Sequence, residues 1–235
     1  MSEHREPSSN ADEGNAGVAA TQSFYTRWAA LYDAVATHTP GVGSLRERAV
    51  AALDPAPGDL VVDMGCGTGA NFPSLRERVG PEGTVVGVDF TPGMVARARH
   101  RIEREGWENV HVVRGDATRP PIAAADSLFS SFVSGMLADP AAVVDGWCDL
   151  VGSGGRVGVL DLGRSTRPVG RPANALFHGL VFAASPSKRG AVTGAASALD
   201  ARIAAAQRRL RERCSDATYS THALGFARLG VGTVD

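Results

Sequence analysis

The amino-acid sequence predicts an α/β fold: a mostly parallel seven-stranded sheet with helices on both faces and an antiparallel hairpin at its C-terminal end. From residue 59 onward, short valine-rich runs alternate with helix-length segments, which is the pattern of strand, crossover helix and parallel strand. Runs such as Leu60-Val61-Val62 are continuously apolar, as strands are when both faces of a sheet are covered. Residues 217–234 have β character interrupted by Gly225 and Gly230, which favours the closing hairpin.

The composition is typical of one globular domain. Hydrophobic residues make up 43% of the 235 positions, and 24 Lys and Arg against 25 Asp and Glu give a net charge of −1, which argues against a nucleic-acid partner. Cys66, Cys148 and Cys214 are widely spaced and form no Cys-x-x-Cys pair, so neither a disulfide framework nor a metal site is expected. Because the sequence has no membrane-length apolar run and no signal-like N-terminus, we expect a soluble, cytoplasmic protein.

The individual elements follow from periodicity and from stop signals. Strands are expected at Leu60–Met64, Thr84–Val88, Val110–Arg114, Ser127–Val133 and Arg156–Leu160. Helices are expected near Ser44–Leu53, Asn71–Val79, Pro92–Glu105, Pro140–Leu150 and Ala195–Cys214.

The N-terminal region divides into an arm and a helix. Residues 1–20 carry almost no bulky apolar side chains, so we expect a disordered arm before a single domain over residues 21–235. A helix over residues 24–35 would place the rings of Tyr25, Trp28 and Tyr32 on one face.

The region 163–215 is expected to form an insertion or cap. In its long helix, an apolar stripe runs alongside an arginine-rich face. A solvated face is the commoner role for such arginines, and contact with anionic lipid headgroups at a membrane surface is the alternative.

A glycine-rich loop follows the first strand. Residues 61–69 read Val-Val-Asp-Met-Gly-Cys-Gly-Thr-Gly and lead into a helix, which is the context of a nucleotide-binding loop, although a βα turn also uses glycine simply to fit. Asp89 ends the next strand, where a carboxylate can accept both hydroxyls of a ribose. Asp116 follows the third strand, where a carboxylate can accept an exocyclic amine. Together with Asp63, these acids lie at the sheet edge where open α/β folds bind ligands.

With these motifs, the sequence resembles the class I S-adenosylmethionine-dependent methyltransferases from Phe24 to the C-terminus. The family's first motif corresponds to residues 61–69, its acidic second-strand motif to residues 87–94, and its third motif to Gly115-Asp116-Ala117. The resemblance implies a Rossmann-like fold and S-adenosylmethionine as the cofactor. Residues 25–33 and 83–91 are similar to the ubiquinone/menaquinone-biosynthesis branch, which usually carries Arg-Asn where this chain has Met136-Leu137.

The resemblance also implies a set of cofactor-binding residues. The amino-acid end of the cofactor would contact the glycine loop, and the ribose would contact Asp89. The adenine would lie near Met94, Asp116 and Ala117. Ser131 and Phe132 would line the side nearest the reacting methyl. The implied set is Asp63, Gly65, Cys66, Gly67, Thr68 and Gly69, then Asp89 and Phe90, then Met94, Asp116 and Ala117, and finally Ser131 and Phe132.

The acceptor side rests on fewer signals. Tyr25 and His178 are the candidate catalytic residues, with Tyr32, His38 and Asp139 as further candidates for a base or a substrate contact. Each also has a structural explanation, since buried aromatic rings and single histidines commonly serve packing. The apolar character of these segments favours a small, mostly apolar acceptor, with a quinone precursor as one candidate.

Two other functions are compatible with the loop. One is a non-catalytic subunit that binds S-adenosylmethionine and regulates a partner, because a cofactor site does not require an acceptor site. The other is a nicotinamide-dependent dehydrogenase, which commonly uses a Tyr-x-x-x-Lys pair. Lys188 is the single lysine, and Ala184 stands where the tyrosine would be, which disfavours the dehydrogenase. The sequence does not indicate an oligomeric state.

Overall fold

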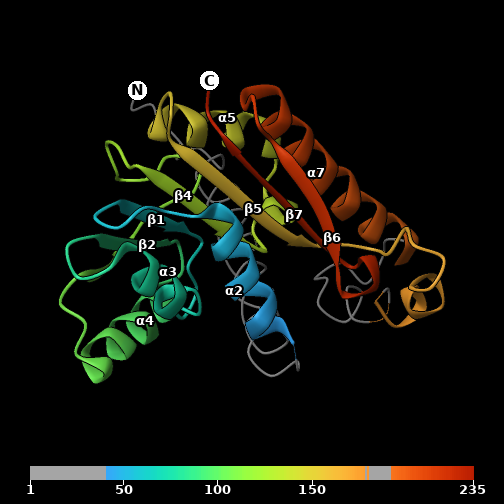
Figure 1. Ribbon diagram of the computed structural model, residues 1–235. Coiled ribbons are helices and arrows are strands. Elements are labelled where there is room, and N and C mark those ends of the chain that lie inside the picture. The colour runs from blue at the N-terminus through green and yellow to red at the C-terminus, as the bar shows by residue number, and fades with distance from the viewer. Residues whose placement is uncertain (1–40, 178, 180–191) are drawn as a thin grey trace, which may run out of the picture.

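A computed structural model describes residues 41–177, 179 and 192–235 (Figure 1). The expected arm over residues 1–20 and helix over residues 24–35 lie outside the described residues. The same holds for Tyr25, His38 and His178.

From residue 42 to residue 162 helices and strands alternate, except that the third and fourth strands follow each other without a helix between them, and the chain ends with a long helix and two strands. The helices are α2 (Val42–Leu53), α3 (Phe72–Val79), α4 (Pro92–Glu105), α5 (Pro140–Val151) and α7 (Val192–Arg213), with short 3-10 turns η1 (Ser134–Met136), η2 (Arg171–Ala173) and η3 (Ala223–Gly225). The strands are β1 (Leu60–Met64), β2 (Thr84–Asp89), β3 (Val110–Arg114), β4 (Ser127–Ser131), β5 (Arg156–Leu162), β6 (Thr218–His222) and β7 (Ala227–Thr233).

The seven strands form one sheet in the order β3-β2-β1-β4-β5-β7-β6. The first five are parallel, and the last two form an antiparallel hairpin in which β7 pairs with β5. The predicted fold class is therefore confirmed. The chain runs outward from β1 through β2 to β3 and then returns to the other side of β1 through β4. This change of direction between β1 and β4 is the place where such sheets bind ligands.

Helices cover both faces of the sheet (Figure 1). One hydrophobic cluster joins Val61 and Phe129 to α2, α3 and α4, and the other joins Val62 and Leu128 to α5 and α7. The alternation follows from the period of two along a strand. Because Asp63 lies two residues after Val61, its side chain points to the face covered by α2 and α3.

Some boundaries differ from the expectation. Strand β4 ends at Ser131 rather than Val133, because Phe132 adopts a left-handed conformation with φ 64° and donates its N–H to the carbonyl of Leu160 at 2.6 Å. Strand β5 continues to Leu162 because it pairs with Ala227 of β7. The expected apolar stripe of the last long helix is confirmed, since all of its members are buried: Leu199, Ile203, Ala206, Leu210 and Cys214.

The described residues contain neither a helix suited to a membrane nor a cluster of metal ligands. None of the described helices combines the length and the apolar character needed to cross a membrane. Within the described ranges, no three His, Cys, Asp or Glu side chains are grouped so that they could hold a metal ion.

Phe129 tests the packing of the sheet against α2. Its side chain is fully buried on the central strand β4, so Phe129→Ala should lower the free energy of unfolding by about 3–5 kcal/mol in urea denaturation. Leu176→Ala, at a side chain that is 79% exposed, should change it by less than about 0.5 kcal/mol. Equal effects of the two substitutions would contradict the described core.

Candidate functional site

The glycine loop between β1 and α3 has three residues with positive φ: Gly65 at 72°, Gly67 at 56° and Gly69 at 77°. A Cβ on Gly65 would lie 2.3 Å from Val133, and a Cβ on Gly69 would lie 2.4 Å from the Phe72 ring, so packing excludes side chains there. A Cβ on Gly67 would meet nothing within 4 Å. The two ends of the loop therefore pack against side chains, whereas its middle at Gly67 is open. This leaves room for a ligand against the backbone.

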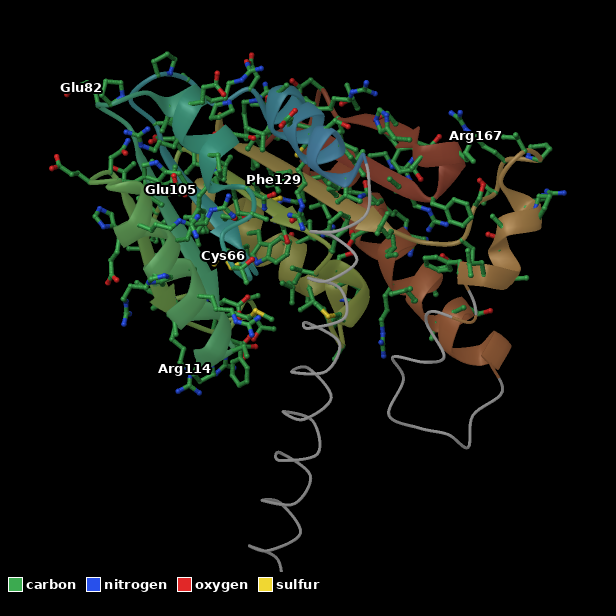
Figure 2. The ribbon with its side chains drawn as sticks, turned by 90° about the horizontal axis from the view of Figure 1, so that it is seen from below. Cys66, Glu82, Glu105, Arg114, Phe129 and Arg167 are labelled. Atoms are coloured by element: carbon green, nitrogen blue, oxygen red, sulfur yellow. The ribbon has the colours of Figure 1, made fainter. Side chains whose placement is uncertain are left out.

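Asp89 joins the glycine loop to the ends of the two neighbouring strands. Its Oδ2 accepts the N–H of Gly67 at 2.9 Å, and its Oδ1 accepts the N–H of Thr91 at 2.8 Å. Its main-chain oxygen accepts the N–H of Gly115 at 3.0 Å, just after β3. Figure 2 labels Cys66 on the loop and Arg114 at the end of β3, on the sheet edge opposite Glu82. The predicted clustering of these strand ends is thus observed.

Asp63 lies beneath the loop in a buried polar cluster. Its side chain is fully buried, and its Oδ1 accepts a hydrogen bond from Nδ2 of Asn71 at 2.9 Å. Its Oδ2 is also buried and has no hydrogen-bond partner among the described residues. Nη1 of Arg46 donates to Oδ1 of Asn71 and to Oγ of Ser131, both at 2.8 Å. The cluster joins α2, β1, α3 and β4 at one point.

The burial of Asp63 changes its acid–base behaviour. Loss of water around the carboxylate raises its pKa from 3.8 to about 7, against the hydrogen bond from Asn71 and the charge of Arg46, which both lower it, while the charge of Asp89 raises it further. Perturbed carboxyls of this kind are concentrated at functional sites. Cys66 is also buried, and the same loss of water, with the charges of Asp63 and Asp89, raises the pKa of its thiol, so it is protonated at neutral pH.

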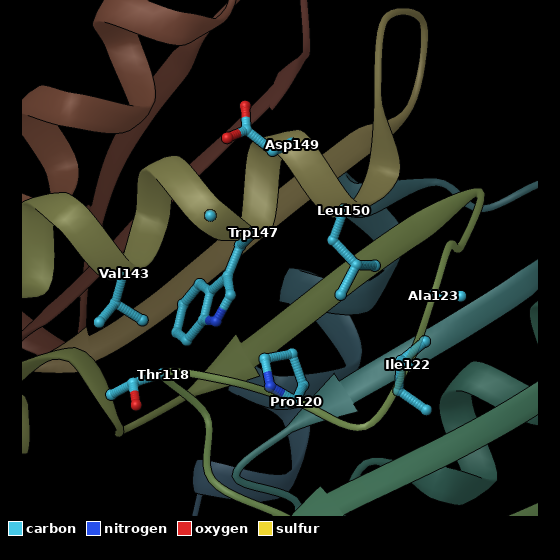
Figure 3. A pocket seen from close by; sticks show the side chains of 9 residues that line it. Thr118, Pro120, Ile122, Ala123, Val143, Trp147, Asp149 and Leu150 are labelled. Carbon is cyan, nitrogen blue, oxygen red and sulfur yellow. The ribbon is translucent and has the colours of Figure 1, made fainter.

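The third acidic residue, Asp116, lies at the same edge of the sheet but is exposed to solvent. Asp116 is exposed, and its Oδ1 accepts the N–H of Thr118 at 2.8 Å, so the carboxylate stabilises the turn after β3. The next residue, Ala117, accepts a hydrogen bond from Nε1 of Trp147 in α5 at 2.8 Å. Figure 3 shows Trp147 in a pocket of about 320 Å³ between α5 and the segment that contains Thr118 and Pro120. None of its lining residues belongs to the glycine loop or to the strand-end acids.

The remaining predicted cofactor residues occupy different environments. Phe90 is 41% exposed, with the guanidinium of Arg114 at 5.8 Å from the ring centre, whereas Met94 is buried in the first turn of α4. Phe132 is buried, and the guanidinium of Arg46 lies 4.8 Å from its ring centre. A left-handed conformation at such a bulky residue is uncommon and typical of functional segments.

The acceptor candidates are only partly described. Asp139 accepts the N–H of Ala142 at 3.1 Å and so caps the N-terminus of α5, which is a structural role. Phe177 packs against Phe226 with ring centres 5.7 Å apart, so the segment that leads to His178 contacts the start of β7.

Sequence reasoning missed three polar residues of this edge. Arg46 stands at a core position of the apolar face of α2, and this position was a usable signal, because a charged residue is rare there. Asn71 precedes α3 directly after the glycine loop and gave no signal in its spacing. Asp161, at the end of β5, is buried and accepts a hydrogen bond from Oγ of Ser134 at 2.5 Å, and burial raises its pKa to about 6.

Comparison with known proteins gives consistent matches. Residues 61–155 match the family model of a methyltransferase domain. The chain is 31% identical to the phosphatidylethanolamine N-methyltransferase of Cereibacter sphaeroides over 60% of its own length and 68% of that enzyme. It is 34% identical to the demethylmenaquinone methyltransferase of Corynebacterium kroppenstedtii over 56% and 54% of the two chains.

A solved structure supports the same fold. A SAM-dependent methyltransferase from Aquifex aeolicus superimposes with a TM-score of 0.54 over 81% of this chain and 89% of that chain, at 16% identity.

Three other curated relatives are matched over 31%, 51% and 48% of their length, so the chain spans about half of them or less.

The cluster beneath the loop predicts a specific titration. Asn71→Ala removes the hydrogen bond that favours the ionised form of Asp63, so the pKa of Asp63 should rise above its value of about 7. Carboxyl carbon NMR over a pH series measures this shift. Asn174→Ala, whose amide bonds only with Ser165 in the described residues, serves as the control and should leave the titration of Asp63 unchanged. An unchanged or lowered pKa in the Asn71 variant would disprove the assignment.

Proposed function

The chain belongs to the class I S-adenosylmethionine-dependent methyltransferases, and we propose that it transfers the methyl group of S-adenosylmethionine to a small, mostly apolar acceptor. One observation carries the proposal: the glycine loop, Asp89 and the buried Asp63 converge at the sheet edge between β1 and β4. Convergence of an open backbone turn with carboxylates suits a ligand that carries a ribose and a positive charge. We also propose that residues 21–235 form a single methyltransferase domain, in which residues 163–215 form part of the acceptor-binding site.

The residues at this edge fit the cofactor on two counts. The fully buried Asp63 has one oxygen without a hydrogen-bond partner among the described residues, which is unfavourable unless a ligand donates to it. The open side of Gly67 leaves its backbone accessible. Asp89 would hold the ribose hydroxyls, since its carboxylate lies at the end of β2 against the backbone of the glycine loop. Asp116, Ala117 and Met94 would lie near the adenine.

Methyl transfer then requires mainly that the protein position the acceptor next to the cofactor. S-adenosylmethionine supplies a methyl group that its sulfonium already activates. The residues of the chain have to hold the acceptor in line and exclude water, and alignment of this kind is worth about 7–11 kcal/mol of barrier in favourable cases. Ser131 and Phe132 would form the wall nearest the methyl, because Ser131 ends β4 beside the glycine loop and Phe132 follows it. Tyr25 and His178 are our candidates for contact with the acceptor or its proton.

The acceptor class rests on apolar content. Where the quinone-biosynthesis branch usually carries Arg-Asn, this chain has Met136 and Leu137, and Leu137 is buried against the second core cluster. Matched relatives are named for acceptors as different as arsenite, a phospholipid and demethylmenaquinone, so the matches do not select one acceptor. A quinone precursor is one candidate among apolar acceptors.

Asp89→Ala tests the cofactor site. Losing a carboxylate that accepts two hydroxyls should weaken S-adenosylhomocysteine binding by about 30- to 1,000-fold in calorimetry, equivalent to about 2–4 kcal/mol. Asp149→Ala is the matched control, because that carboxylate is 71% exposed on α5 and pairs with Arg213. If the Asp89 variant binds as tightly as the Asp149 variant, Asp89 does not hold the ribose.

The acceptor side has its own test. Tyr25→Ala and His178→Ala should lower the rate of methyl transfer to quinol and phenol acceptors while the affinity for S-adenosylhomocysteine stays nearly constant, because neither residue belongs to the cofactor set. Radiolabelled methyl transfer and calorimetry measure the two quantities. A variant that loses cofactor binding or unfolds instead would show that the residue is structural.

A further inference from the structure

The turn after β4 contains the residues proposed to form the wall nearest the methyl. Strand β4 ends at Ser131, Phe132 follows in a left-handed conformation with φ 64°, and the 3-10 turn η1 begins at Ser134. A bulky residue keeps a conformation of this kind only where the surrounding structure holds it. The contacts of this turn therefore decide where the Phe132 ring lies.

Strand β5 holds the turn at two successive residues. The carbonyl of Leu160 accepts the N–H of Phe132 at 2.6 Å. The next residue, Asp161, is buried, and its Oδ2 accepts a hydrogen bond from Oγ of Ser134 at 2.5 Å. The N–H groups of Ser134 and Gly135 also donate to the carboxylate of Asp161. Asp161 thus accepts from three donors of one turn.

The same turn packs between the glycine loop and α7. A Cβ on Gly65 would lie 2.3 Å from the Val133 side chain, and a Cβ on Gly135 would lie 2.2 Å from Leu199 of α7. Ser134 lies between these two contacts. Loss of its hydrogen bonds with Asp161 would therefore leave the conformation of the turn without support on the side of β5.

Other partners engage the charged groups nearest to this carboxylate. Arg228 of β7 lies opposite Asp161 in the sheet, and its Nη2 donates to the main-chain oxygen of Arg164 at 2.9 Å and to Asp200 of α7 at 3.3 Å. Arg202 of α7 donates to the main chain of η1 at 3.4 Å. Strand β4 and η1 carry no ionisable side chain. The acids of α5 take part in a separate set of ion pairs with α7, formed by Asp145, Asp149, Arg209 and Arg213.

Ionisation of Asp161 depends on this environment. Loss of water on burial raises its pKa from 3.8 to about 6, although the hydrogen bonds from Ser134 and Gly135 and the charge of Arg228 lower it. Because all three donors favour the ionised form, the carboxylate holds the turn at neutral pH. Protonation below about pH 6 weakens that hold.

We propose that Asp161 is a positioning residue for methyl transfer, whose carboxylate holds Ser134 and Gly135 and so keeps Phe132 beside the methyl group of the bound cofactor. The inference rests on the proposed function and deepens it. Val159 belongs to the cluster with α5 and α7, so Asp161, two residues later, points to that face of the sheet. Asp63 points to the opposite face. Asp161 therefore acts through the turn and not on the cofactor directly.

The methyl group of S-adenosylmethionine can report on this wall. An aromatic ring shifts the NMR signal of a methyl group beside it, so cofactor labelled with carbon-13 at the methyl group should give a bound signal that moves with a midpoint near pH 6. In Asp161→Asn, the bound signal should lose this titration. The Kd for S-adenosylmethionine at neutral pH should change by less than about threefold in that variant.

Two further variants sharpen the test. Asp126→Asn is the matched control, because Oδ2 of Asp126 accepts the N–H of Leu60 at 2.8 Å at the opposite edge of the sheet, and it should keep the wild-type titration. Ser134→Ala removes one of the three donors to Asp161. Its midpoint should therefore move to higher pH.

The outcomes separate a positioning role from a purely structural one. A bound signal that does not titrate in the wild-type chain, or that titrates equally in Asp161→Asn, would overturn the inference, as would a loss of affinity of more than about threefold in that variant. If Asp161→Asn fails to fold, an unchanged midpoint in Ser134→Ala still overturns it. A wild-type chain that gives no bound signal contradicts the proposed function itself, which separates the two failures.

Discussion

A carboxylate held without water near the carboxyl end of β1 is the constraint on which this edge of the molecule depends. Asp63 belongs to β1, the strand from which the sheet grows in both directions, and it faces α2 and α3 rather than solvent. Ionising it there is unfavourable, as its raised pKa shows. The hydrogen bond from Asn71 and the charge of Arg46 offset part of this cost. The same contacts join α2, β1 and α3, and the hydrogen bond from Arg46 to Ser131 adds β4, which is distant from them in sequence.

The geometry of the loop follows from the same arrangement. Gly65 and Gly69 have no room for side chains because Val133 and Phe72 pack against them, so the loop is held from below. Asp89 holds it from the side through the N–H of Gly67. A backbone fixed at these points loses little freedom when a ligand binds, and such preorganisation lowers the cost of recognition. The strand-end acids and the loop therefore act as one surface.

Much of the fold could be predicted from the sequence, because strand and crossover helix have different periods and the glycine loop has a fixed context. The limits of β1 and β3 agree residue for residue with the expectation. The end of β4 could not be predicted, since the turn at Phe132 depends on a hydrogen bond to Leu160 of another strand. Asn71 was missed for a related reason, because its role appears only when α2, α3 and β4 meet. Tyr25 and His178 remain predictions.

Calorimetry with S-adenosylmethionine, S-adenosylhomocysteine and NAD in parallel tests the central claim most directly, because all three carry an adenosine and only the first two carry an α-amino acid. A site built around a buried acid beneath an open glycine turn should bind S-adenosylmethionine and S-adenosylhomocysteine at one site per chain and give no heat with NAD. Binding of NAD without binding of either sulfur compound would contradict the account and identify the loop as a dinucleotide site.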